Sequence, residues 1–529
     1  MAIGVRLVGK CHKGGRDALD PPVISRDQIV LFSQRLDEVL PQQHSVRRLV
    51  EVLEQLDWTK WEAEYKHEGS GRPPVHPRVM SGIVLYGLMR GVRSSRQLEE
   101  ALQMRLDFRW LAEARSIDHS TICRFRRSHA EQLKELFVQI TLVAKHAGLL
   151  SLVELAVDGT KIRASNHRSA KFKVEELAAW KAQLELRFEE LNEQADKLDR
   201  EQTVERAKLA KQLENTQSRL NQINRAIEAV AELEANGETI PTRMPTTDVE
   251  SRVTKSKEGG FAPNYTPVTA VDPQSGLIAA TEVIADSNEK SVLPAALDEV
   301  EATLGEQPQR VLADAIYGHG SNLKAMDERG VELHTPIDVA ANNPANRDDP
   351  TQPVPSHQWD ELPTKNNQLS KEAFVYDKAG NRYFCPLGKE LAYNSTYNDK
   401  QAQGTIQRHR YHAREEDCAG CPLLARCVKG ESKFRRVTRD DAEHLREEMR
   451  VRMQSEAGQE AYRRRMVGER PFAMIKQWMG MRQFLHRGLE RVKQEWRWIA
   501  AAFNLHRLIN LLPARAGPDE PLQLDLPPP

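Results

Sequence analysis

The spacing of hydrophobic residues changes along the chain, and each change predicts a different kind of structure. Between residues 26 and 149, hydrophobic side chains recur every three or four positions, which is typical of helices packed through one face. One such stripe is formed by Leu49, Val52, Leu53 and Leu56. Ser94 and Gln97 have the spacing of a helix capping box. Residues 26–149 are therefore expected to form a helical domain.

A second pattern, with a leucine every seven residues, begins at Leu177 and belongs to a segment predicted over residues 171–236. Such a heptad repeat predicts a coiled coil. The phase of the repeat changes between Leu198 and Leu209, which predicts two helices folded back on each other as a hairpin. A coiled coil between two molecules is the alternative.

Short hydrophobic runs elsewhere predict a sheet. Strands are expected at residues 152–158, 265–271, 277–284, 310–318 and 331–337. The second and third are joined by Asp-Pro-Gln-Ser-Gly, a sequence typical of a hairpin turn, and helices are expected before and after the fourth. The pattern predicts a mixed α/β sheet within a catalytic domain of residues 150–512, into which the helical hairpin is inserted.

The remaining segments have weaker patterns. Residues 338–440 look irregular and contain four of the six cysteines, so a cysteine-containing insertion is expected there. Residues 1–25 are expected to be flexible. The Pro-rich tail, residues 513–529, is expected to be disordered.

Charge is balanced over the whole chain but not along it. Residues 71–130 contain eleven arginines and five acidic residues, a net charge of +6, and residues 461–510 carry +8. Residues 171–240 carry −4. Local basic regions favour nucleic acid as a partner whatever the total charge. The chain has no run of 18 apolar residues and no signal-peptide core at its start, so a cytoplasmic protein without membrane contact is expected.

A short basic helix near the end of the helical domain is the candidate for recognition of double-stranded DNA. Asp118 and Ser120 are suitable helix caps, and Arg124, Arg126 and Arg127 follow them. A helical domain that ends in such a helix is similar to a helix-turn-helix. A solvated charged face is the alternative.

Asp158 and Asp314 each end the hydrophobic run of a predicted strand. In open α/β sheets, ligand chemistry takes place beyond the carboxyl ends of the strands, so both carboxylates are expected to face one crevice. The alternative for each aspartate is a role in a turn or a helix cap.

A third candidate acid lies in a polar stripe made by Tyr462, Arg465, Glu469 and Lys476. At about 100° per residue, their spacings of three, four and seven place all four on one narrow face of a helix. A lone acid among arginines suits a metal ligand beside bound phosphates. The alternative is an ion pair between Glu469 and Arg465, and Pro471 is a candidate kink.

The same spacing, Tyr462-x2-Arg465-x3-Glu469-x6-Lys476, resembles the YREK motif of DDE insertion-sequence transposases. Asp158 in Val-Asp-Gly-Thr-Lys and Asp314 in Ala-Asp-Ala-Ile-Tyr-Gly resemble the first and second acids of that family. The helical domain, with its Asp-His-Ser-Thr-Ile-Cys-Arg segment, resembles the domain that precedes the catalytic domain in these enzymes.

The resemblance implies an RNase H-like (retroviral-integrase-like) fold in which Asp158, Asp314 and Glu469 bind two Mg²⁺ ions, with Mn²⁺ as a substitute. Two metal ions of this kind stabilise charge on the attacking and leaving oxygens of a phosphodiester. Tyr462, Arg465 and Lys476 would hold phosphates nearby. The implied partners are the terminal inverted repeats and target DNA, bound by a homodimer associated with a bacterial nucleoid.

Two other functions share part of this pattern. A catalytically silent DNA-binding regulator derived from a transposase would keep the basic regions but would not need the three acids. An RNase H-type RNA nuclease would keep the acids but would need neither the YREK spacing nor a separate basic helical domain. The presence of all these features together favours the transposase.

The clustered cysteines are a separate candidate site. Cys385 and the series Cys418-x2-Cys421-x5-Cys427 resemble a four-thiolate zinc site. His409 or His412 could replace one thiolate. Cysteines without a ligand, and redox chemistry, are the alternatives.

Overall fold

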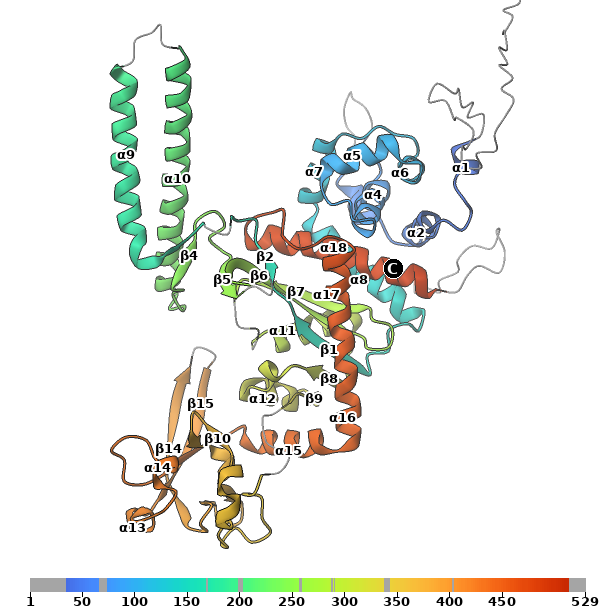
Figure 1. Ribbon diagram of the computed structural model, residues 1–529. Helices are drawn as coiled ribbons and strands as arrows, with labels where there is room; N and C mark the ends of the chain where they lie inside the picture. Colours follow the sequence, from blue (N-terminus) through green and yellow to red (C-terminus); the bar gives the residue numbers. More distant parts are fainter. Residues whose placement is uncertain are drawn as a thin grey trace, which may run out of the picture.

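The computed structural model describes residues 35–65, 74–167, 170–197, 203–255, 259–286, 289, 291–336, 343–401 and 404–512 (Figure 1). The terminal segments predicted to be flexible or disordered, residues 1–25 and 513–529, lie outside these ranges. The described chain contains both helices and a mixed sheet, which confirms an α/β protein. None of the described helices is long and apolar enough to cross a membrane.

The described residues from 35 to 149 form helices and no strand. The helices are α1 (Leu36–Val39), α2 (Ser45–Glu54), α3 (Thr59–Ala63), α4 (Pro77–Met89), α5 (Ser95–Met104), α6 (Leu106–Leu111), α7 (His119–Ser128) and α8 (Ala130–His146). The central helix α4 is buried along nearly its whole length. The predicted capping box begins α5: Gln97 N donates to Ser94 Oγ at 3.1 Å, and Ser94 N donates to Gln97 Oε1 at 3.4 Å.

The central sheet contains seven strands. They are β1 (Glu154–Gly159), β2 (Ile162–Arg163), β5 (Arg252–Lys255), β6 (Phe261–Val271), β7 (Ile278–Ile284), β8 (Arg310–Ala313) and β9 (Glu332–His334). Strands β7, β6 and β1 are antiparallel neighbours, whereas β1, β8 and β9 run parallel. The resulting order, β7-β6-β1-β8-β9, places the carboxyl ends of β1 and β8 side by side.

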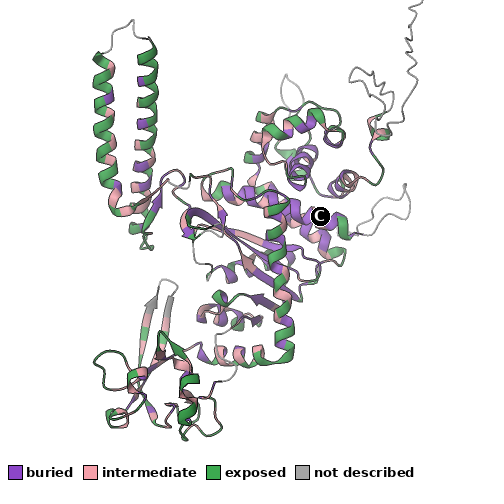
Figure 2. Ribbon diagram, in the orientation of Figure 1, coloured by how far each residue is buried: buried purple, intermediate pink, exposed green. Residues whose placement is uncertain are grey.

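Helices cover this sheet and join it to the helical domain. α11 (Val292–Leu304) packs on β7, and α12 (Gly320–Glu328) links β8 to β9 after the short 3-10 helix η2 (Ala315–Tyr317). The long helix α18 (Leu489–Leu511) contacts β7, α4 and α8, and is buried over most of its length (Figure 2). The sheet and the helical domain therefore share one hydrophobic core.

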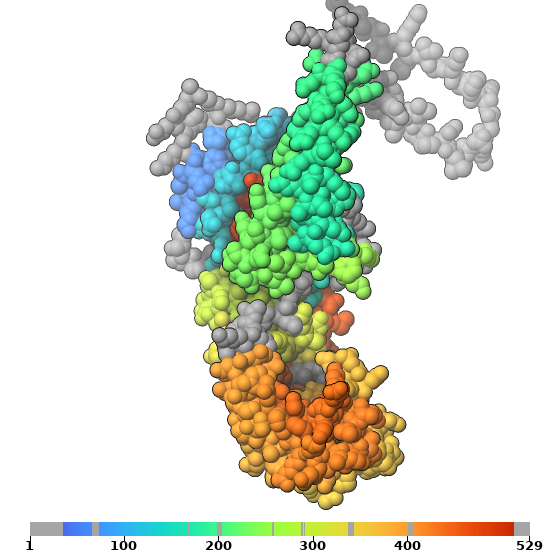
Figure 3. Space-filling model, turned by 90° about the vertical axis from the view of Figure 1, so that its left-hand side faces the viewer, coloured from blue at the N-terminus to red at the C-terminus, as the bar shows by residue number. Residues whose placement is uncertain are grey.

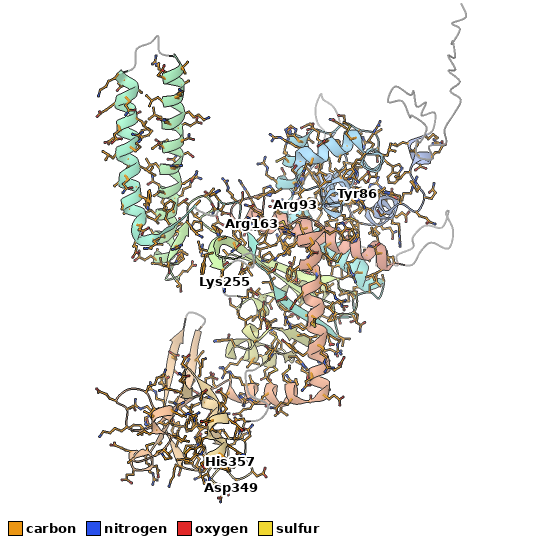
Figure 4. The ribbon with its side chains drawn as sticks, viewed as in Figure 1. Tyr86, Arg93, Arg163, Lys255, Asp349 and His357 are labelled. Carbon is orange, nitrogen blue, oxygen red and sulfur yellow. The ribbon has the colours of Figure 1, made fainter. Side chains whose placement is uncertain are left out.

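Two polar contacts fix α18 in this junction. The side-chain amide of Asn504 pairs with both backbone groups of Ile278, at 2.8 and 2.7 Å. Arg93, labelled in Figure 4 between the helical domain and the sheet, forms an ion pair with Glu495 at 3.0 Å. The Arg93 guanidinium also donates to the carbonyl of Gln483.

The segment with the heptad pattern forms a helical hairpin, α9 (Leu177–Lys197) and α10 (Thr203–Ala235), that extends away from the sheet (Figure 1). The first six residues of the predicted helix instead form β3 (Lys171–Lys173) and the 3-10 helix η1 (Val174–Glu176). β3 pairs with β4 (Arg243–Pro245) at the base of the hairpin. The two helices pack against each other within one chain, and most of their surface is exposed (Figure 2).

Residues 343–440 form a smaller unit with its own core. Its strands are β10 (Thr364–Lys365), β11 (Gln368–Leu369), β12 (Val375–Asp377), β13 (Arg382–Phe384), β14 (Glu390–Gln401), β15 (Gly404–Ala413) and β16 (Arg436–Asp440). The last five form an antiparallel sheet, so the expectation of an irregular segment is wrong. Both long strands carry polar residues on both faces, which hides the alternation that normally indicates a strand.

Short helices complete the smaller unit. They are η3 (Ser356–Glu361), η4 (Lys371–Ala373), α13 (Glu415–Cys418) and α14 (Leu424–Cys427). α15 (Glu443–Gln454) then leads back to the central sheet. From the side shown in Figure 3, the helical hairpin, the central sheet and the smaller unit follow one another from top to bottom.

Candidate active site

The sheet brings Asp158 and Asp314 to adjacent positions. In the parallel pair of β1 and β8, Val157 is the register partner of Ala313, so the two aspartates are the next residues along neighbouring strands. Such strands lie about 4.8 Å apart. Asp158 is half-buried within β1, whereas Asp314 is exposed and accepts a hydrogen bond from Ala315 N at 2.7 Å. The two predicted acids therefore share one edge of the sheet.

Glu469 reaches the same edge from a segment that crosses β1. This segment consists of α16 (Glu456–Arg463), the 3-10 helix η5 (Arg464–Glu469) and α17 (Arg470–Gln477). The prediction of one regular helix is wrong here, because η5 winds at about 120° per residue and changes the angles between the four polar side chains. The four side chains lie near the ends of β1 and β8 because η5 packs on β1, and not because they lie on one face of a regular helix.

Two features hold η5 against β1. A Cβ atom on Gly468 would lie 3.1 Å from the Cβ of Ala156, so the missing side chain permits close contact between η5 and the strand. The guanidinium of Arg464 forms hydrogen bonds of 2.7 to 3.0 Å with both carboxylate oxygens of Glu154, at the start of β1. Pro471 lies in the first turn of α17, where its missing N–H costs no helical hydrogen bond.

The electrostatics of Asp158 are those of a crowded anionic site. Burial raises the pKa of its carboxyl group to about 6. The N–H of Gly159 and the charge of Arg465 oppose this increase, while the negative charges of Glu469 and Glu289 reinforce it. A cation bound here would favour the ionised form of Asp158 by offsetting both burial and repulsion.

Glu289 is a fourth carboxylate at this site, and the sequence pattern gives no signal for it. Its Oε2 accepts a hydrogen bond from the Tyr317 hydroxyl at 3.0 Å. It also lies against Gly159, where an added Cβ would be 2.1 Å from Oε2. The missing side chain of Gly159, the residue after Asp158, therefore provides the space for Glu289.

The other residues of the predicted stripe take different positions. Arg465 contacts Glu469 at 3.1 Å and lies 5.6 Å from the ring centre of Tyr462. Arg465 also interacts with the charges of Asp158 and Asp314. Lys476 donates to Thr160 Oγ1 at 2.6 Å and to the Lys161 carbonyl at 3.2 Å, and so holds the loop that follows Asp158.

The carboxylates of Asp158, Asp314 and Glu469 are the kind of ligand that a hard divalent cation binds, but their oxygens do not converge on one point. Within the described ranges, no group of three or more His, Cys, Asp or Glu side chains has an arrangement that could hold a metal ion. Glu469 is turned towards Arg465, and Asp314 caps η2. Mg²⁺ prefers carboxylate oxygens. Asp158, Asp314 and Glu469 are the side chains that could supply them if Glu469 released Arg465.

The three arginines of the predicted DNA-binding helix do not all face solvent. Arg124 and Arg127 are exposed on α7, but Arg126 is buried and its NH1 donates to the Arg93 carbonyl at 2.7 Å. The expectation that Arg126 contacts DNA is therefore wrong. It lies on the same helical face as Ile122, four residues earlier, which points into the hydrophobic core.

The four cysteines of the predicted zinc site lie in the smaller unit and belong to a separate site. Cys427 is buried in its core, and Cys385, Cys418 and Cys421 pack around that core. The two histidines considered as substitutes lie on β15. His409 Nδ1 is 2.7 Å from Thr396 Oγ1, and the ring of His412 packs against Phe434 at 5.5 Å.

Comparison with known families places this arrangement in context. A family model described as "Transposase domain (DUF772)" matches residues 34–128, which are the helical domain up to α7. A second, described as "Transposase DDE domain", matches residues 384–509, which include Tyr462, Glu469 and Lys476 but not the two aspartates. No curated protein matches the chain. Two transposase families, matched in this order along one chain, indicate that the protein is a DDE-type insertion-sequence transposase.

Proposed function

We propose that this transposase binds the terminal inverted repeats of its mobile element and catalyses metal-dependent cleavage and strand transfer of DNA. The observation that carries the proposal is the meeting of Asp158 and Asp314 at adjacent strand ends, with Glu469 on a segment packed against β1. The order β7-β6-β1-β8-β9, in which the first three strands are antiparallel and β8 and β9 run parallel to β1, supports an RNase H-like catalytic core. Carboxylates at this edge suit the two Mg²⁺ ions that a two-metal mechanism of phosphodiester cleavage uses.

Each side chain has a distinct task in this proposal. Asp158, the most enclosed of the three acids, would hold the metal ions together with Asp314 and Glu469. When bound, the ions would supply the positive charge that stabilises the attacking and leaving oxygens. Glu469 must leave Arg465 to reach a metal, and the released guanidinium is then free to donate to a phosphate. Lys476 keeps the loop after Asp158 in place through Thr160.

The exposed arginines of α7 are proposed to contact repeat DNA. Replacing Arg124 and Arg127 by Ala should weaken repeat binding and reduce the slope of log affinity against log salt by about two, because each phosphate contact contributes about 0.9. Filter binding over a salt series measures this slope. The matched control replaces Arg206 and Arg219 of the acidic hairpin, both exposed, and should leave the slope unchanged. Equal slopes for both variants would assign repeat recognition to another surface.

The close packing of η5 gives a test of how Glu469 is positioned. Gly468→Val should reduce DNA cleavage strongly, because the added side chain pushes η5 away from Ala156 and moves Glu469. Overpacking of this kind costs about 1–3 kcal/mol of folding free energy. Gly468→Ala, with one added carbon at 3.1 Å, should have a smaller effect on both properties. Thermal unfolding and cleavage assays separate the two effects. Full cleavage by the folded Gly468→Val protein would contradict this role of η5.

The proposed function can be tested in cells with a short artificial element, a marker gene between the two ends of the natural locus. Expression of the chain should excise the marker and insert it elsewhere, and Asp314→Asn should abolish both events. Two ends must be cut together, so two copies of the chain are expected on the DNA. Marker movement that continues with Asp314→Asn would overturn the catalytic assignment. Normal repeat binding without any movement would favour a regulator.

A further inference from the structure

The smaller unit contains a second cluster of chemically reactive side chains, distinct from the carboxylates. Cys385 follows β13, Cys418 ends α13, Cys427 ends α14, and Cys421 lies between those two short helices. All four border one small hydrophobic core. They lie close enough that Cys385, Cys418 and Cys421 each act electrostatically on Cys427. No cysteine among the described residues forms a disulfide. In the arrangement described, the four sulfurs are not gathered closely enough to hold a metal ion.

The backbone after Cys385 forms a tight turn that directs an N–H at the sulfur. Gly388 N donates to the Cys385 carbonyl at 2.9 Å, and Lys389 N donates to the Cys385 sulfur at 3.3 Å. Burial raises the pKa of the Cys385 thiol, and the N–H groups directed at the sulfur oppose this increase. Gly388 has a φ of +74°, and a Cβ there would lie 1.9 Å from the Thr351 carbonyl oxygen. Only glycine fits this turn.

The turn between Cys418 and Cys421 resembles the first. Cys421 N donates to the Cys418 carbonyl at 3.2 Å, and Gly420 has a φ of +73°. Two residues between cysteines is the usual spacing for a pair of zinc ligands on one turn. The two turns therefore provide three thiols, and Cys427 provides the fourth from the core side.

Two arginines near the cluster donate hydrogen bonds to cysteine carbonyl oxygens and not to the sulfur atoms. Arg347 donates to the Cys385 carbonyl at 2.7 Å, and Arg435 donates to the Cys427 carbonyl at 2.6 Å. The nearby histidines are less suited to replace a thiol, because His409 contacts Thr396 and His412 packs on Phe434. The donor set at the cluster is therefore four sulfurs.

We propose that Cys385, Cys418, Cys421 and Cys427 bind one structural Zn²⁺ ion that holds the turns of the smaller unit to its five-stranded sheet. Zinc would gather the sulfurs to about 2.3 Å from the ion, so the side chains must close up from the arrangement described. A small core with long connecting segments gains most from such a link. Because all four ligands belong to this unit, zinc binding is independent of the carboxylate site.

The test is the metal content and spectrum of the full-length protein. Protein purified without chelators should contain one zinc per chain by mass spectrometry, and replacement by Co²⁺ should give the sulfur-to-cobalt charge-transfer absorption and tetrahedral bands of a four-thiolate site. Cys421→Ser should lose the zinc or shift the cobalt spectrum. Cys123→Ser, a change at the half-buried cysteine of α7, should alter neither.

Several results would overturn this proposal. They are wild-type protein without zinc that also fails to bind Co²⁺, a disulfide between these cysteines in freshly purified protein, and loss of zinc in His409→Ala or His412→Ala. The wild-type cobalt spectrum decides the question even if Cys421→Ser does not fold. Asp314→Asn should keep its zinc, so failure of the zinc proposal and failure of the catalytic proposal can be told apart.

Discussion

Glu469→Gln is expected to abolish DNA cleavage while the protein still folds and binds repeat DNA. The substitution keeps the size of the side chain but removes the charge that a second metal ion needs. Outer partners of metal ligands typically contribute about 10- to 100-fold to affinity or activity, so loss of a ligand should cost at least about 100-fold. Binding of repeat DNA should be equal or tighter, because one negative charge near the phosphates is removed.

The folding cost of this change should be small. Glu469 is 57% exposed, although its i,i+4 partner Arg465 is only 15% exposed. Because the substituted side chain itself is largely in solvent, the lost pair should contribute under about 1 kcal/mol. Glu460→Gln is the matched control, since Glu460 lies on α16 and contacts Arg463 in a similar exposed pair. The control should cleave normally with Mg²⁺ and with Mn²⁺. If Glu469→Gln cleaves as well as Glu460→Gln, Glu469 is a surface residue and not part of the active site.

Among the substitutions proposed for this protein, Arg93→Ala is expected to lower the free energy of unfolding the most. Its partner Glu495 has a side chain only 1% exposed, on the helix that joins the helical domain to the sheet. Burial alone would raise the pKa of Glu495, but the hydrogen bond and charge of His486 and the charge of Arg93 hold it below the usual value. Removing one partner of a buried ion pair costs about 3–5 kcal/mol, because the remaining charge has lost its compensation.

Chemical denaturation of the variant measures this cost. The remaining contacts of Glu495 with Leu485 N, His486 N and the His486 ring place the expected value near the lower limit, about 3 kcal/mol. Arg96→Ala, at an exposed position in the same domain, should change stability by less than about 0.5 kcal/mol. A loss for Arg93→Ala as small as that of the control would show that the junction does not depend on this pair.

The strands and their acids were predictable because hydrophobic runs end at Asp158 and Asp314. Their meeting at one crevice was expected from the general rule for strand ends and from the family resemblance. The strand pairing that produces it was not, because no local pattern records that β1 pairs in parallel with a strand more than 150 residues later. Glu289 is hidden for the same reason, since its contact with Gly159 exists only in the folded sheet. Long-range pairing, and not local propensity, assembles this site.

Two predictions from the sequence were wrong, the regular helix from Tyr462 to Lys476 and the exposure of Arg126. The regular-helix angles for Tyr462 to Lys476 assume an α-helix throughout, whereas packing of Gly468 on Ala156 favours a tighter 3-10 segment. The burial of Arg126 had a visible signal, because it follows Ile122 by four residues on an amphipathic helix. The balance of charges in the region did not distinguish an arginine that faces the core from one that faces solvent.

We infer that Asp158, Asp314 and Glu469 form one metal-dependent centre that cuts DNA at the ends of the mobile element. The most direct measurement incubates the wild-type chain with Mg²⁺ and DNA that spans one end of its own element, followed by sequencing of both cut strands. We expect a cut at the boundary between element and flanking DNA that leaves a 3′-OH on the element, requires Mg²⁺ or Mn²⁺, and is absent with Asp158→Asn. Cuts at random positions, or cuts that persist in Asp158→Asn or in EDTA, would contradict it.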